Sequence, residues 1–320
     1  MQHNQSNMRS LPEPAESPFL LVNVDAYKRW RDSKLAAFPA HIDDIKIAVA
    51  DLANPTPTEL ARISGVIKRA NLAVYMSPPR ADDADGKSER RALQAFLDRF
   101  GLVSVERHRS AEKDGFVAIE VSDAAAKRGF IPYTTRPLNW HTDGYYNPPE
   151  SAIRAMLLHC VRAAVVGGEN ALLDPEIAYI RLRDANPLWV AALMRPDAMT
   201  IPESVEEDGS VRPVSVGPVF AVDEFDGSLR MRYTARGRSI AWRDDKDTRG
   251  AVAFLEQLLK EGSEPLIFRV RLAPGEGLIC NNVLHTRTAF DGSGFSSRLI
   301  LRARFATRIS TRSFLSATSA

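Results

Sequence analysis

The stretch SRLILRARF, at residues 297–305, predicts a β-strand because apolar and charged side chains alternate along it. Similar short runs, bounded by Gly, Pro, Asp and Asn, follow one another from residue 115 onward. They are GFVAIEV (115–121), AIRAMLLHCVRAAVV (152–166, long enough for two strands), PVSVGPVFAV (213–222), SLRMRYTA (228–235), PLIFRVRL (265–272) and GLICNNVL (277–284). Many short strands separated by turn residues predict a mainly β sandwich or barrel with flanking helices.

The N-terminal part differs, because strand and helix patterns alternate there. Strands are predicted near 45–49 and 72–76, and the helices near 25–38, 55–70 and 89–100. We therefore expect a flexible N-terminal tail (1–17), an α/β N-terminal flank packed on the core (18–114), and a core with helical insertions (115–320). The uneven distribution of strands favours one structural unit over two independent domains.

The composition argues against several classes of function. The chain has 320 residues, with 42 Lys and Arg against 40 Asp and Glu, so nucleic acid and anionic membranes are not expected partners. Cys160 and Cys280 are the only cysteines, too few for a disulfide framework or a thiolate zinc site. No run of 18 apolar residues exists and the N-terminus is polar, so we expect a cytoplasmic protein. A homo-oligomer is left open.

The segment NWHTDGYY, residues 139–146, carries two side chains that bind metals. His141 and Asp143 are separated by one residue, so on an extended segment they point to the same face. His285, within NNVLHTRTAF (281–290), comes at the end of an apolar strand. Two histidines and one carboxylate form the facial triad of mononuclear non-haem iron(II) sites, which keeps coordination positions open. The pattern therefore predicts a metal site built from these three residues.

Arginines follow the distal histidine on the predicted strand 297–305. Arg298 comes 13 residues after His285, and Arg302 and Arg304 share its face of the strand. An unpaired buried guanidinium is costly, so this row should face water or an anion. The planar fork of arginine suits a carboxylate. A dicarboxylate bound to the metal at one end would need such an arginine at the other, and the spacing favours Arg298 over Arg302.

Taken together, WHTDGYY, GGEN (167–170), NNVLHTRTAF and SRLILR resemble the TauD/TfdA family of iron(II)- and 2-oxoglutarate-dependent dioxygenases over about residues 135–305. NNVLHTRTAF resembles the γ-butyrobetaine-hydroxylase-like branch in particular. The resemblance implies a double-stranded β-helix, a cupin-like jelly roll, with Fe(2+) as the metal and 2-oxoglutarate and O2 as co-substrates.

The same resemblance implies roles for single residues. His141, Asp143 and His285 would ligate iron, and Arg298 would bind the distal carboxylate of 2-oxoglutarate. Asn170 stands where the family often has threonine, and its amide can still donate to that carboxylate. Arg302 matches a second arginine that meets a substrate anion in sulfonate-oxidising relatives.

Further residues near these motifs are candidates with two interpretations each. Tyr133 and Tyr145 flank the proximal motif and either contact substrate or pack. Arg287 follows the distal histidine by two residues and either points into the same pocket or forms a structural salt bridge. Arg230 and Arg232 share one face of SLRMRYTA, which is either a solvated strand face or a cationic mouth for an anionic substrate.

These observations predict an iron(II)/2-oxoglutarate-dependent oxygenase that oxidises a C–H bond of a small, anionic molecule, most simply by hydroxylation. Succinate and CO2 would be released, and no side chain beyond the metal ligands is assigned a catalytic role. Two alternatives remain open. A zinc hydrolase could use the same triad but would not need Arg298, whereas a non-catalytic jelly-roll binding protein would have no reason to retain all three ligands.

Overall fold

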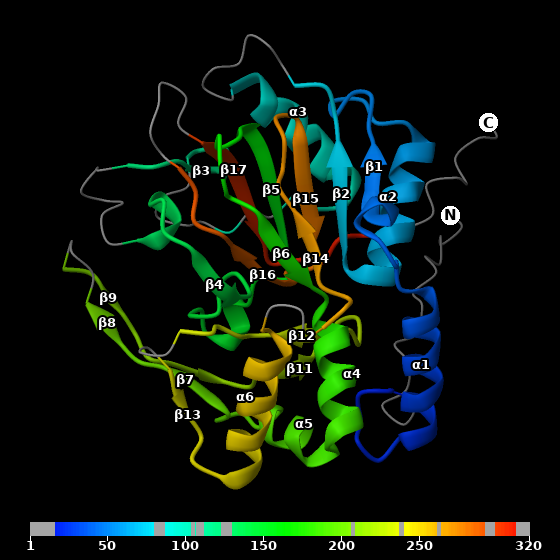
Figure 1. Ribbon diagram of the computed structural model, residues 1–320, viewed down its shortest axis with the longest axis vertical. Helices are drawn as coiled ribbons and strands as arrows, with labels where there is room; N and C mark the ends of the chain where they lie inside the picture. Colours follow the sequence, from blue (N-terminus) through cyan, green and yellow to red (C-terminus); the bar gives the residue numbers. More distant parts are fainter. Residues whose placement is uncertain are drawn as a thin grey trace, which may run out of the picture.

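Two facing β-sheets form the centre of the protein (Figure 1). The computed structural model describes residues 17–79, 87–103, 106, 112–122, 130–205, 209–236, 240–260, 264–291 and 298–311. The larger sheet has the order β1-β2-β15-β5-β17-β3, and the smaller has the order β14-β6-β16-β4. In the larger sheet the strands are β1 (Lys46–Ala48), β2 (Leu72–Met76), β3 (Val117–Ile119), β5 (Ala155–Arg162), β15 (Glu276–Cys280) and β17 (Leu299–Phe305). Those of the smaller sheet are β4 (Leu138–His141), β6 (Asn170–Leu173), β14 (Phe268–Val270) and β16 (Leu284–Arg287).

The pairing of these strands is that of a jelly roll with added N-terminal strands. β1 and β2 are parallel, whereas the other neighbours in the two sheets run antiparallel. β2 pairs with β15, so the N-terminal strands extend the same sheet that contains β5 and β17. The boundaries 1–17, 18–114 and 115–320 stay a prediction, and residues 1–16 lie outside the described part.

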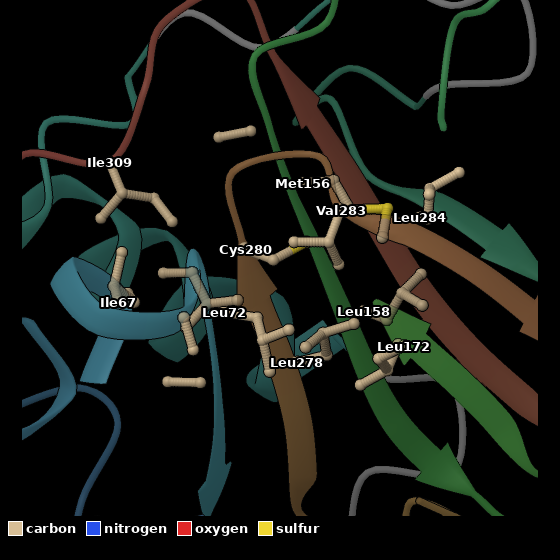
Figure 2. Close-up of a cluster of buried hydrophobic side chains, with 14 of the residues drawn as sticks. Ile67, Leu72, Met156, Leu158, Leu172, Leu278, Cys280, Val283, Leu284 and Ile309 are labelled. Carbon is tan, nitrogen blue, oxygen red and sulfur yellow. The ribbon is translucent and has the colours of Figure 1, made fainter. Parts of the chain in front are cut away.

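The space between the sheets is filled with aliphatic side chains. Figure 2 shows Leu158 of β5, Leu278 of β15 and Leu172 of β6 within one buried cluster. The other face of β5 is buried too: His159 lies against Tyr75 of β2, with Nδ1 3.0 Å from the phenol oxygen. A strand buried on both faces needs no polar alternation, which explains why β5 is apolar apart from His159 and its last residue, Arg162.

Helices lie around the two sheets and beyond one end of them (Figure 1), and several begin at a recognisable cap. They are α1 (Val24–Ala37), α2 (Pro57–Ala70), α3 (Lys87–Arg99), α4 (Pro175–Ala185), α5 (Pro187–Leu193) and α6 (Lys246–Leu258), with short 3-10 turns at Ile42–Ile45, Ile131–Tyr133 and Pro149–Ser151. Thr56 and Glu59 form a capping box at the start of α2. Asp174 and Asp245 cap α4 and α6 with their side chains. None of the helices in the described ranges is long and apolar enough to cross a membrane.

Shorter strands lie beyond the smaller sheet, between α5 and α6 in sequence (Figure 1). β7 (Met199–Ile201), β10 (Ser215–Gly217) and β13 (Ala241–Trp242) form one sheet, while β8 (Ser204–Val205) pairs with β9 (Val211–Arg212), and β11 (Phe220–Val222) with β12 (Leu229–Met231). The predicted class, mainly β with flanking helices around a jelly roll, is confirmed. The run 152–166 contains a single strand, β5, because Val165 and Val166 lie exposed in the turn before two glycines.

Candidate metal centre

Two histidines lie side by side on neighbouring strands. β4 and β16 are antiparallel, and His141 is the partner of His285 in their register. Their ring centroids are 4.2 Å apart. Oδ1 of Asp143 lies 3.7 Å from Nε2 of His141 and 3.9 Å from Nε2 of His285. Ligand atoms of all three residues lie within 4.8 Å of one another, so the structure brings together the triad that the sequence spacing predicted.

Backbone carbonyls determine which nitrogen of each imidazole faces the cluster. Nδ1 of His141 lies 2.8 Å from the carbonyl oxygen of Asn139, and Nδ1 of His285 lies 3.0 Å from that of Val283. A ring nitrogen must carry its proton to donate to a carbonyl, so in the neutral ring Nε2 keeps its lone pair. Both lone pairs therefore belong to the atoms nearest Asp143, as two imidazole ligands require.

Burial and charge hold the three side chains in the forms that bind a cation. Burial, assisted by His285, lowers the pKa of His141 to about 3, and burial also lowers the pKa of His285. Burial alone would raise the pKa of Asp143, but the guanidinium groups of Arg302 and Arg304 outweigh it and lower that pKa. At neutral pH the cluster therefore consists of two neutral imidazoles and one carboxylate.

One carboxylate oxygen in this cluster lacks a hydrogen bond. Oδ2 of Asp143 is buried and accepts none within the described residues, although Nη1 of Arg302 lies 3.5 Å away. A buried anionic oxygen without a donor is costly, and a bound cation would remove that cost. Two imidazoles with one carboxylate are the donor set of non-haem iron(II) sites. The residues present therefore fit an iron ion.

Asn282, which sequence reasoning missed, holds the main chain at Asp143. Its Oδ1 accepts from the Asp143 N–H at 2.8 Å, and its Nδ2 donates to the carbonyls of Asp143 at 3.0 Å and Ile153 at 2.8 Å. Its φ of 49° lies in the left-handed region, which asparagine tolerates better than most residues. The local signal was the Asn-Asn pair between two apolar runs, which is typical of a turn and does not indicate the long-range contact.

The two arginines of β17 face carboxylates instead of water; Arg304 is buried and Arg302 is partly buried. Nη1 of Arg304 donates to the hydroxyl of Tyr146 at 2.9 Å, and Arg304 also forms an ion pair with Glu106. The amide of Asn147 donates to the same glutamate at 2.9 Å. Arg304 thus ties the turn that follows His141 and Asp143 to β17, and Arg302, also on β17, lies beside Asp143.

Arg298 precedes β17 and packs against Phe290, with its guanidinium carbon 5.2 Å from the ring centroid. Burial lowers the pKa of Arg298 to about 10. Gly167 and Gly168 have φ values of 77° and 73°. A Cβ on Gly168 would lie 3.4 Å from Nε of Arg298, and one on Gly167 would lie 2.1 Å from the carbonyl oxygen of Ala289. The two glycines therefore allow this loop to approach the arginine closely.

The side chains of Asn170 and Arg287 both donate hydrogen bonds to main-chain carbonyl groups. Asn170 begins β6, and its Nδ2 donates to the carbonyl of Val270 at 3.4 Å. An amide group has two donor hydrogens, so this contact leaves one for the carboxylate of 2-oxoglutarate. Binding of 2-oxoglutarate by Asn170 stays a prediction. Arg287 donates to the carbonyls of Pro132 at 3.1 Å and Thr134 at 2.8 Å, so it holds a loop instead of forming the salt bridge considered from the sequence.

The sequence profile of the taurine catabolism dioxygenase TauD, TfdA family matches residues 85–304. The chain belongs to the TauD/TfdA family. Two curated relatives are named uridine-5′-phosphate dioxygenase. The one from Amycolatopsis sp is 29% identical over 177 residues, covering 54% of this chain and 62% of the relative. The one from Streptomyces sp is 30% identical over 197 residues, covering 53% and 62%. The match to this chain thus spans less than two thirds of their length.

Solved structures share the fold of this TauD/TfdA-family chain. AAD-2 in complex with Mn(II) and N-oxalylglycine superposes with a TM-score of 0.57 at 14% identity, covering 83% of this chain and 94% of the other. A taurine dioxygenase from Burkholderia xenovorans gives 0.53 at 17%, covering 84% and 89%. Asparagine oxygenase in complex with Fe(II), 3-hydroxyasparagine and succinate gives 0.51 at 19%, covering 78% and 79%. These likenesses confirm the jelly-roll fold.

The tyrosines of the TauD/TfdA-family chain differ in their access to the cluster. The ring of Tyr145 lies edge-on to His141, with the centroids 6.4 Å apart, and next to Tyr146 at 5.2 Å. Tyr133, in a 3-10 turn, is buried. Contact with substrate stays a prediction for Tyr133 and Tyr145, with the position of Tyr145 beside His141 the more favourable one.

Arg230 and Arg232 do not form a shared cationic mouth. Nε of Arg230 lies 3.2 Å from Oδ2 of the buried Asp223. Arg232 donates to the carbonyls of Tyr145 at 2.8 Å and Met199 at 3.0 Å. The alternation along residues 228–235 indicates that the two arginines share a face. The groups that bind their guanidiniums come from distant segments of the chain.

Proposed function

We propose that the protein is an iron(II)/2-oxoglutarate-dependent oxygenase that oxidises a C–H bond of a small, anionic molecule and releases succinate and CO2. The observation that carries the proposal is the cluster of His141, Asp143 and His285, with its ligand atoms within 4.8 Å of one another; Asp143 and His285 are buried and His141 is partly buried. Arg298 supports 2-oxoglutarate as co-substrate, because a buried guanidinium pairs favourably with a distal carboxylate. Family membership adds to this support.

Iron bound with 2-oxoglutarate and O2 would supply the oxidising chemistry. The chain would supply binding and orientation. Carbonyl groups fix both imidazoles through Nδ1, and Arg302 keeps Asp143 ionised. Arg298 would hold the end of 2-oxoglutarate that is remote from the metal. Asp143 and His285 are buried and His141 is partly buried, so little water surrounds the three side chains, which strengthens each of these electrostatic contacts.

Release of succinate tests the proposed function. Protein stripped of metal with a chelator, reloaded with Fe(II) and supplied with O2 and a panel of small anionic substrates should convert 2-oxoglutarate into succinate and CO2 in a ratio of one to one, with the second oxygen atom of O2 taken up by the oxidised substrate, as followed by mass spectrometry. The same protein loaded with Zn(II) should release none, because zinc has no redox chemistry. Ester or amide hydrolysis with Zn(II) and no succinate with Fe(II) would instead support the hydrolase. Binding of a panel compound without turnover by either metal form would support the binding protein.

Two arginines near the metal centre support an anionic substrate. The guanidinium carbon of Arg212, on β9, lies 5.9 Å from the ring centroid of Tyr146. Nη1 of Arg212 is buried and has no hydrogen-bond partner within the described residues. Burial raises the pKa of Tyr145, and Arg236 and Arg212 both act against that rise. Both cations therefore act on the tyrosine that lies beside the first metal ligand. The relatives named for uridine 5′-phosphate lead us to propose a phosphate-bearing substrate.

Arg212→Gln should raise KM for uridine 5′-phosphate about tenfold, the scale of one charge-assisted hydrogen bond. The release of succinate without substrate should be unchanged, because Arg212 does not contact the triad. Arg249→Gln is the matched control, since Arg249 is an exposed arginine of α6 and should leave KM unaltered. The measurement is initial rates with uridine 5′-phosphate and with uridine. Equal KM values for the two compounds, or an uncharged best substrate in a wider panel, would contradict the anionic substrate.

We further propose that nucleic acid and anionic membranes are not partners, because the charge of the chain is balanced. A cytoplasmic location is proposed from the lack of a long apolar run. Assembly into a homo-oligomer stays open to a measurement of mass in solution.

A further inference from the structure

The turn between β15 and β16 contacts two of the three proposed metal ligands through adjacent residues. Asn282 holds the main chain of Asp143 from both sides, accepting from its N–H at 2.8 Å and donating to its carbonyl at 3.0 Å. The carbonyl of Val283, the next residue, lies 3.0 Å from Nδ1 of His285. The separation of the carboxylate from this imidazole is therefore determined by two neighbouring residues of one turn.

The turn itself is fixed from the opposite side. The N–H of Asn281 donates to the carbonyl of Asn71 at 2.8 Å, and its side-chain amide donates to the side-chain oxygen of Asn71 at 3.1 Å. Oδ1 of Asn281 accepts from the N–H of Ile309 at 3.1 Å. Asn71 ends α2 and also donates to Asp174 at 3.0 Å. Val283, Ile309 and the neighbouring Leu284 lie in the aliphatic core, as Figure 2 shows.

We propose that Asn282 is a positioning residue of the metal centre, which sets the placement of Asp143 relative to His285 through the main chain. The proposal rests on the metal site of the proposed function. Its basis is geometric, since one buried side chain makes three hydrogen bonds and two of them go to the ligand's own peptide groups. Groups that orient a metal ligand commonly change metal affinity or activity by about 10- to 100-fold when they are lost.

Asn282→Gly removes the side-chain hydrogen bonds and keeps the backbone conformation. Glycine adopts the left-handed φ of 49° without steric cost, so the variant removes the three side-chain contacts and little else. We expect its affinity for Fe(II) to fall about 10- to 100-fold. Asn71→Gly is the matched control. Asn71 is the other described non-glycine residue with positive φ, at 58°, it is also buried, and its side chain bonds to Asn281 and Asp174 but not to Asp143. In Asn71→Gly the turn is still held by the main-chain bond from Asn281 to residue 71 and by the bond from Ile309 to Asn281. This control should lower the melting temperature and leave Fe(II) affinity within about twofold.

Coordination is followed separately from stability by the visible spectrum of the Co(II)-loaded protein, which responds to ligand number and geometry. The spectrum should change in Asn282→Gly and stay that of the wild type in Asn71→Gly. Asn282→Asp is a second variant in case glycine prevents folding, because it keeps the acceptor for the Asp143 N–H and loses both donors. It too should bind Fe(II) more weakly, although its added negative charge alone would strengthen binding.

Three results would overturn the proposal: wild-type Fe(II) affinity and Co(II) spectrum in Asn282→Gly, an equal loss of affinity in Asn71→Gly, or tighter binding by Asn282→Asp. Each measurement is a direct binding experiment on the full chain and needs no turnover. A wild-type protein that binds Fe(II) but releases no succinate would contradict the proposed function alone, and a wild-type protein that binds no Fe(II) would contradict both.

Discussion

Replacing Asp143 with asparagine should abolish Fe(II) binding and, with it, the release of succinate from 2-oxoglutarate. The substitution keeps the size of the side chain but replaces an anionic ligand by a weak neutral one. It also leaves the guanidinium group of Arg302, 3.5 Å from the carboxylate, without its counter-charge. Isothermal titration with Fe(II) under anaerobic conditions gives the affinity, and circular dichroism shows that the fold is retained.

Asp223→Asn is the matched control for this experiment. Asp223 is a buried aspartate with two arginine partners, Arg154 at 3.0 Å and Arg230 at 3.2 Å, and it is not a member of the triad. Its loss should destabilise the fold by roughly 3–5 kcal/mol, the usual cost of breaking a buried ion pair, and leave Fe(II) binding intact. Wild-type affinity in Asp143→Asn, or an equal loss in Asp223→Asn, would exclude the proposed ligand set.

Arg298→Ala should weaken binding of 2-oxoglutarate by roughly 2–4 kcal/mol, or about 30- to 900-fold. The reason is the loss of a bidentate, charge-assisted pair with the distal carboxylate in a buried setting. Fe(II) affinity without 2-oxoglutarate should be unchanged, and a large excess of 2-oxoglutarate should restore turnover. Titration of 2-oxoglutarate into the Fe(II)-loaded protein without oxygen measures the effect directly.

Arg302→Ala serves as the comparison for Arg298→Ala. Because Arg302 lies beside Asp143 and lowers its pKa, its removal should change Fe(II) binding as well as the later steps. The two variants are therefore distinguished by the affinity that changes: Fe(II) affinity changes only in Arg302→Ala, whereas Arg298→Ala loses affinity for 2-oxoglutarate alone. A pure 2-oxoglutarate defect in Arg302→Ala, together with normal binding in Arg298→Ala, would identify Arg302 as the co-substrate arginine.

The sequence predicted the positions of helices and strands more accurately than the burial of their side chains. The strand 72–76 coincides with β2, and the helix near 55–70 corresponds to α2, because caps and periodicity are local signals. The run 152–166 was misleading, since exposed Val165 and Val166 have the same apolar character as the buried strand before them. Alternation along 297–305 predicted a shared face for its arginines, but it does not show whether water or protein lies opposite that face.

The same limit applies to the metal centre. The convergence of His141 and Asp143 follows from the spacing of two residues on an extended segment, and the register of β4 with β16 brings in His285. The contact between Asn282 and Asp143 joins residues 139 positions apart in the chain. No periodic pattern in the sequence indicates such a contact. The sequence likewise does not indicate that Arg304 is buried beside Tyr146 and Glu106.

The strand order of the larger sheet determines when the protein can fold during synthesis. β2, at 72–76, has β15, at 276–280, as its antiparallel neighbour, and β5 lies between β15 and β17, whose last residue is Phe305. β1 and β2 can pair with each other early, but the other edge of β2 has no partner until about two hundred further residues, up to β15, have been added. Pairings so distant in sequence form slowly and leave strand edges exposed meanwhile. Co-expressed chaperones that cover these edges should for this reason increase the soluble yield of recombinant protein.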